Sequence, residues 1–175
     1  MIPEKYKWLE REPGPKMLLE ALKIYGTKET VGKQHNPVIM GWAKEVGLEK
    51  VYTADEIPWC GLAIAVLADR AGWGVVKDPL WALNWAKWGN ESKDPELGDI
   101  LTFKRPGGGH VGIYVGEDAT AYHVLGGNQD NAFNITRIAK HRLYAARQAA
   151  WKVAKPNNVR KILLSATGKL STNEA

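Results

Sequence analysis

The sequence has a single cysteine, Cys60, and therefore no partner thiol for an internal disulfide. One cysteine also excludes the disulfide framework of a small secreted domain and any cysteine-rich zinc site. The chain lacks internal repeats and low-complexity runs as well. The thiol must then be a buried core group, a reactive group or an incidental one.

A long hydrophobic run is also lacking. The first ten residues contain no apolar core of secretory length, and no later segment approaches the roughly 18 uncharged apolar residues that span a bilayer. We therefore expect a cytoplasmic protein without a signal peptide and without stable membrane insertion, which acts elsewhere only after release. With 175 residues, 45% of them hydrophobic and 25% charged, the chain fits one soluble domain.

The charge balance is basic, with a formal net charge of +5 and a pI near 9.2. Such a balance favours an anionic partner, which could be a nucleic acid, an acidic membrane face or a cell-wall polymer, although many basic proteins have no such partner. The positive charge is dispersed and no nucleic-acid motif is recognisable, so nucleic-acid binding is not expected.

The hydrophobic period changes along the chain. Spacings of three and four predict helices over residues 13–25 and 37–46, from Cys60 to residue 71, and briefly after Asp78-Pro79, while residues 90–98 form a polar turn region. Alternation predicts strands over residues 100–103, 111–115, 121–125, 135–138 and 143–146. A helical half followed by an antiparallel meander indicates an α+β fold. We expect a catalytic domain over residues 1–151 and a basic, partly flexible extension over 152–175.

Cys60 follows Pro58 and Trp59 and begins a long apolar run. Proline does not continue a preceding helix, so Cys60 is expected in the first turn of a buried helix. The backbone N–H groups and dipole there favour thiolate, and at such sites a cysteine pKa of about 8.5 can fall to roughly 3.5–7.5. An inert core cysteine fits this stretch equally well.

A nucleophilic cysteine needs a base within hydrogen-bond reach. His110 is the leading candidate, because it follows the glycines 107–109 and begins a strand, where another element can approach closely. His35 and His141 lie in polar loops and are expected at the surface. His123 lies within a predicted strand next to Tyr122, where a sheet or core histidine and a catalytic base are about equally expected.

A third polar group should orient that base. Asn128 fits, because an amide oxygen can accept from the far ring nitrogen of a histidine, as in other Cys-His-Asn arrangements. Gln129 and Asp130 are close rivals. A hairpin turn that uses Gly and Asn for backbone reasons alone is the alternative.

Four segments, in this order, resemble the CHAP and NlpC-type cell-wall hydrolases. They are residues 55–60 (DEIPWC), 98–101 (GDIL), 109–116 (GHVGIYVG) and 126–129 (GGNQ). The resemblance covers roughly residues 14–150 and is closest to a phage-associated branch. It implies a papain-like α+β fold with helices packed on an antiparallel sheet. It also implies a monomeric endolysin-like enzyme that cleaves an amide bond of bacterial peptidoglycan, as an amidase or as an endopeptidase of the stem or cross-bridge.

Carried onto this sequence, the resemblance makes Cys60 the nucleophile, His110 the general base and acid, and Asn128 the orienting residue. Trp59 would flank the substrate cleft, whereas the stripe Trp81, Trp85 and Trp88 is expected in the core. The position two before Asn128, acidic in many CHAP enzymes, is a glycine here.

No metal and no cofactor are expected. Some relatives bind calcium before the cysteine, but only Asp55 and Glu56 lie there, too few for six to eight oxygen ligands. Two other functions remain open. One is a non-catalytic wall-binding or virion structural module of the same fold, and the other is a secreted antibacterial amidase.

Overall fold

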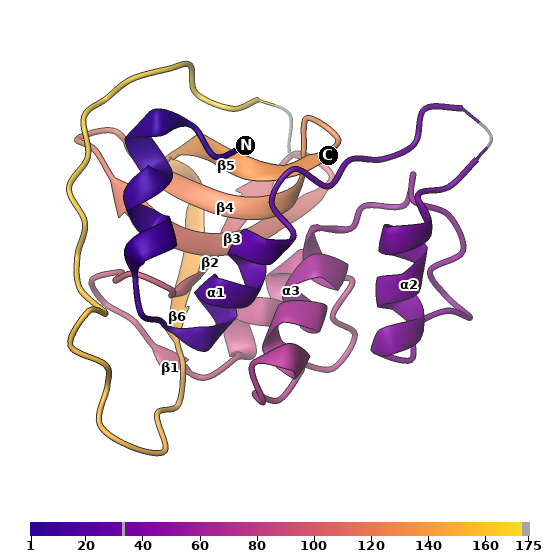
Figure 1. Ribbon diagram of the computed structural model, residues 1–175, viewed down its shortest axis with the longest axis horizontal. Coiled ribbons are helices and arrows are strands. Elements are labelled where there is room, and N and C mark those ends of the chain that lie inside the picture. Colours follow the sequence, from indigo (N-terminus) through magenta and orange to yellow (C-terminus); the bar gives the residue numbers. More distant parts are fainter. Residues whose placement is uncertain (33, 173–175) are drawn as a thin grey trace.

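A computed structural model describes residues 1–32 and 34–172. It has an α+β architecture in which helices α1 and α3 cover one face of a six-stranded antiparallel sheet, and α2 lies on the outer side of α3 (Figure 1). Residue 33, in the loop before the second predicted helix, and residues 173–175, the end of the predicted extension, lie outside the described residues.

The helical half follows the predicted order. The helices are η1 (Glu4–Arg11), α1 (Lys16–Lys23), α2 (Pro37–Glu45), α3 (Cys60–Arg70), η2 (Ala82–Lys87) and η3 (Lys140–Arg142), where η denotes a 3-10 helix. Asn36 caps α2 as its sequence suggests, because its side-chain oxygen accepts from the Val38 N–H at 2.8 Å. The short 3-10 helices η1 and η3 were not predicted. None of the helices in the described ranges has the length and apolar character to cross a bilayer.

All five predicted strands are present in the sheet. The strands are β1 (Asn90–Glu91), β2 (Ile100–Arg105), β3 (Gly108–Glu117), β4 (Ala121–Gln129), β5 (Ala132–Ala139) and β6 (Leu143–Gln148), in the spatial order β1-β6-β2-β3-β4-β5. Strand β1 lies in the region predicted as a polar turn. Its two residues are exposed and pair with Gln148 and Arg147, so no alternation of apolar residues marks it.

Helix α3 is the centre of the core. Its first nine residues, from Cys60 to Ala68, are all buried, and the helix is apolar all round, as expected of a helix with neighbours on every side. Gly61 permits one close approach, because a Cβ there would lie 2.2 Å from the backbone oxygen of Pro79. The chain that leads into η2 therefore passes directly beside the start of α3.

The opposite face of the sheet has a smaller apolar cluster. It consists of Leu101, Phe103, Tyr114, Val124, Ile138 and Ala146. The C-terminal segment 152–172 runs along this part of the molecule (Figure 1), with parallel bridges from Leu163 to Glu117 and from Leu170 to Arg137. The described part of the predicted extension thus pairs with the domain, while the boundary at residue 151 stays a prediction.

Candidate active site

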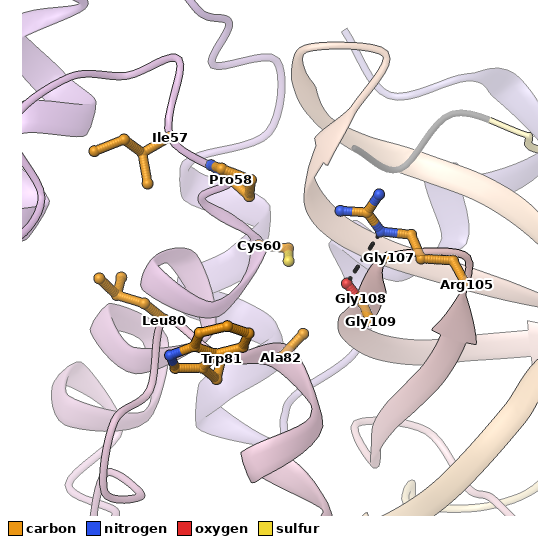
Figure 2. A pocket seen from close by; sticks show the side chains of 10 residues that line it. All are labelled: Ile57, Pro58, Cys60, Leu80, Trp81, Ala82, Arg105, Gly107, Gly108 and Gly109. Carbon is orange, nitrogen blue, oxygen red and sulfur yellow. Dashed lines mark hydrogen bonds between the residues drawn. The ribbon is translucent and has the colours of Figure 1, made fainter.

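Cys60 is the first residue of α3, which confirms its expected place in the helix. The side chain is 2% exposed and lines a cavity of about 310 Å³ (Figure 2). Gly61, directly after it, allows residues 79–80 to form one wall of this cavity. The single thiol of the chain thus lies at the base of a hollow large enough for a small group.

Trp59 does not flank the cavity, contrary to the prediction. Its side chain is fully buried, its indole N–H donates to Glu29 Oε1 at 2.6 Å, and its ring packs on Gly127 of β4, where a Cβ would lie 2.6 Å from the ring. The glycine creates the space that the ring fills. Trp59 therefore fixes the start of α3 against the sheet.

The pKa of the Cys60 thiol is raised above its usual value, because burial disfavours the thiolate. The backbone N–H groups of Val111 and Gly61 and the charge of Arg105 act in the opposite direction but do not outweigh burial. The acidic thiol expected from the helix start alone is therefore not found. A thiol of this kind needs a base to remove its proton.

His110 lies in β3, in the segment whose backbone contacts the thiol. It is fully buried, it faces Phe103 in the β2–β3 pairing, and its ring stacks on Phe103 at 6.4 Å between centroids. The next residue, Val111, directs its N–H to the Cys60 sulfur. The approach expected from the flanking glycines is present, since a Cβ at Gly109 would lie 2.6 Å from the side chain of Leu83 in η2.

Gln129 holds the His110 ring. Its Oε1 lies 3.0 Å from His110 Nε2, while its own Nε2 donates to the backbone oxygen of Asn134 at 2.7 Å and to that of Val124 at 3.2 Å. These two acceptors fix the orientation of the amide, so the atom facing His110 is an oxygen and can only accept. His110 therefore carries its proton on Nε2, and Nδ1 is the basic nitrogen.

Asn128, expected in this role, is displaced by a β-bulge. Continuing the β3–β4 pairing from Ile113 and Leu125 would place Asn128 opposite His110. The register of β4 against β5 shifts between Gly126 and Gln129, and Asn128 adopts a left-handed φ of 58°. An extra residue in a strand moves the side chains that follow it to the opposite face of the sheet. The hydrogen bond to His110 consequently comes from Gln129, while Asp130 is exposed in the next turn.

The cavity has an apolar wall and a polar wall. Ile57, Pro58, Leu80, Trp81 and Ala82 line the helix side, and residues 105 and 107–109, from the β2–β3 hairpin, line the other side (Figure 2). Trp85 and Trp88 are buried, as expected of core residues, but Trp81 is 72% exposed. The prediction that all three tryptophans lie in the core is therefore wrong for Trp81, because this residue precedes η2 instead of lying within it.

None of the four histidines is among the residues that line this cavity, and the other three lie elsewhere in the fold. His35 Nδ1 lies 3.0 Å from Asp55 Oδ1 and is partly exposed, and His141 is exposed. His123 is buried between Tyr6 Oη at 2.6 Å and Asp118 Oδ2 at 2.9 Å. Burial lowers the pKa of His123, although Asp118 acts to raise it. His123 therefore connects η1 to the sheet.

Asp55, one of the two acidic residues shortly before Cys60, is engaged by the protein itself. Asp55 is buried and accepts from the Thr30 N–H at 3.0 Å and the Asn36 N–H at 2.8 Å. Burial acts to raise its pKa, but these hydrogen bonds and His35 together lower it. Within residues 1–32 and 34–172, no group of three or more His, Cys, Asp or Glu side chains is arranged to hold a metal.

No family model matches the chain, and no curated protein matches it. Inference about its function therefore depends on the site and on the sequence.

Proposed function

We propose that this protein is a cysteine-dependent amide hydrolase with a papain-like catalytic arrangement, and that it cleaves peptidoglycan. One observation supports this proposal most strongly. Gln129 fixes the tautomer of the buried His110, whose neighbour Val111 directs its N–H to the sole thiol, and this thiol lines a cavity at a helix start. A histidine with a purely structural role would not need the Gln129 amide to fix which of its ring nitrogens is basic.

The proposed reaction gives each of these residues a role. His110 Nδ1 takes the proton of Cys60, and the sulfur attacks the carbonyl carbon of the scissile amide. Protonated His110 then gives its proton to the leaving amine, which leaves an acyl-thioester on Cys60. Water, deprotonated by His110, hydrolyses the thioester and regenerates the thiol. Throughout these steps Gln129 Oε1 keeps the ring in place and accepts from Nε2–H.

The oxyanion formed in each attack needs donors. The first turn of an α-helix has backbone N–H groups without partners inside the helix. The N–H of Cys60 belongs to this turn and is the candidate donor.

The choice of peptidoglycan depends on the sequence resemblance and on charge. The segments that resemble CHAP and NlpC-type hydrolases contain Cys60 and His110, and the net charge of +5 suits an anionic wall. The role of a phage endolysin stays a prediction, as does the identity of the bond.

Isolated sacculi test the proposal. The wild type should release soluble fragments, and Cys60→Ser and His110→Asn should lower the rate by at least about 100-fold. His141→Asn is the matched control, because this histidine is exposed and lies outside the cavity. Mass spectrometry of the new termini identifies the bond. Turbidity loss that is equal in wild type and Cys60→Ser, or absent from both, contradicts the proposal.

A further inference from the structure

Arg105 stands out among the residues that line the cavity. Of the ten lining residues in the described part of the chain, it is the only one with a charged side chain. It lies at the end of β2, on the hairpin wall, and Cys60 lies on the helix wall (Figure 2). The two share one cavity, and the positive charge of Arg105 acts on the thiol.

The guanidinium is held in place by its own hairpin. Its Nε donates to the backbone oxygen of Gly109 at 3.3 Å, and its Nη2 lies 3.9 Å from the position a Cβ would take at Gly108. A side chain at residue 108 would therefore contact the guanidinium. The bond through Nε orients the plane in which the two terminal nitrogens lie.

Among the residues that the structure describes, no carboxylate pairs with this charge. Within residues 1–32 and 34–172, Arg105 forms no ion pair, whereas Arg70, Arg137 and Arg160 each pair with a carboxylate. An arginine fixed beside a cavity presents terminal N–H donors that match a carboxylate in geometry and charge. The neighbouring wall of Ile57, Leu80 and Trp81 suits an aliphatic portion of the same ligand.

We infer that Arg105 is a specificity-determining residue that binds a carboxylate of the substrate close to the scissile amide. This inference rests on the proposed amide hydrolysis at Cys60 and adds the substrate class. The enzyme selects peptides with a free carboxylate next to the cleaved bond and discriminates against the same peptides with that group amidated. Amidation removes the charge and leaves the size nearly unchanged, so the discrimination depends on Arg105.

Thiol alkylation tests the charge selectivity without any hydrolysis. Iodoacetate has a carboxylate where iodoacetamide has a carboxamide. Both react fastest with thiolates, and Cys60 is the only cysteine of the chain, so mass spectrometry can follow its modification alone. The rate ratio of the two reagents cancels any change in the thiolate fraction. In Arg105→Gln we expect the iodoacetate-to-iodoacetamide ratio to fall by about three- to tenfold, the size of one charge interaction in a partly screened site.

Arg105→Lys is the matched control, since it keeps the charge and should keep the ratio within about twofold of the wild type. The same ratio in wild type, Arg105→Gln and Arg105→Lys overturns the inference. Failure of both reagents to modify the wild type also overturns it, because the cavity would then not admit an anion to the thiol.

A second measurement uses Cys60→Ala and a pair of stem peptides that differ only in one carboxylate or carboxamide. Titration followed by NMR should show tighter binding of the carboxylate form, and Arg105→Gln in the same background should abolish the difference. Equal binding of the two peptides to Cys60→Ala overturns the inference. If the wild type does not hydrolyse sacculi but still prefers the anionic reagent and the carboxylate peptide, the proposed function alone is contradicted. The two failures are therefore distinguishable.

Discussion

Gln129 and His110 form a fixed pair, in which the amide oxygen of Gln129 lies 3.0 Å from Nε2 of the ring. The amide cannot rotate to offer its nitrogen, because that nitrogen already donates to the backbone oxygens of Val124 and Asn134. The pair therefore determines which ring nitrogen of His110 is basic.

Replacing Gln129 by Leu should lower the turnover rate about 100-fold, because the ring loses both its orientation and its tautomer preference. Nitrogen NMR of labelled His110 should show the Nε2–H tautomer in the wild type and a mixture in Gln129→Leu. Asn128→Gly is the control, since glycine accepts the φ of 58° at that position, and it should keep activity within about twofold. A loss in Asn128→Gly with full activity in Gln129→Leu would return the orienting role to Asn128.

The Cys60 thiol should titrate above the ordinary range in the absence of substrate. Burial raises its pKa, so the rate of alkylation by iodoacetamide should keep rising with pH beyond about 8.5. The folded state then favours the neutral thiol, and the corresponding stability is present at low pH and is lost as the pH rises through the raised pKa. A plateau of the alkylation rate below pH 7 would show instead that an ion pair with His110 outweighs burial.

The two tryptophans near the site should respond differently to substitution. Trp59→Ala should cost about 3–5 kcal/mol of unfolding free energy, because the ring is fully buried on Gly127. Trp81→Ala should change stability by less than about 0.5 kcal/mol, since Trp81 is 72% exposed. Trp81→Ala should nevertheless raise KM several-fold, because the ring lines the cavity. Urea unfolding and kinetics on soluble fragments measure both effects, and an unchanged KM would exclude Trp81 from the site.

Much of the fold was predictable from periodicity. The alternation after Asp99 and the helical spacing around Leu62 mark elements with one or two buried faces, and the structure contains them at nearly the expected bounds. The sequence patterns did not predict strand β1 or helix η1, because neither has the regular spacing of buried residues that marks a longer element. The strand has two exposed residues, and the helix is a 3-10 helix with only Tyr6 and Leu9 buried.

For the candidate site, the places of Cys60 and His110 in the fold were predictable, but the side-chain geometry was not. Cys60 and His110 follow from a helix start and a glycine-flanked strand start. The choice between Asn128 and Gln129 depends on one bulge, which no local pattern revealed, although Gly126-Gly127 and the following Asp130-Asn131 mark an irregular strand end. Arg105 could have been suspected from its place directly before the glycine turn that precedes His110.

Asp99 should make stability depend on pH in a direction unusual for an aspartate. Its carboxyl is 2% exposed, and burial raises its pKa from 3.8 to about 6, although Ser92 Oγ at 2.6 Å and the Glu96 N–H at 3.0 Å both donate to Oδ2. The folded state thus holds the proton more tightly than the unfolded state. The stabilising effect is full below about pH 4 and is lost as the pH rises through 6.

Asp99→Asn isolates this contribution, because Asn keeps an acceptor for Ser92 and cannot ionise. The difference between a pKa of 3.8 and one of about 6 corresponds to roughly 3 kcal/mol. Relative to the wild type, the variant should gain up to about this amount of unfolding free energy between pH 3 and pH 8. Glu12, Glu45 and Asp118 have lowered pKa values and oppose the trend, but they are common to both proteins and cancel in the comparison. Urea unfolding curves that stay parallel for the two proteins across this range would show that Asp99 titrates normally, with its charge stabilised by the two donors.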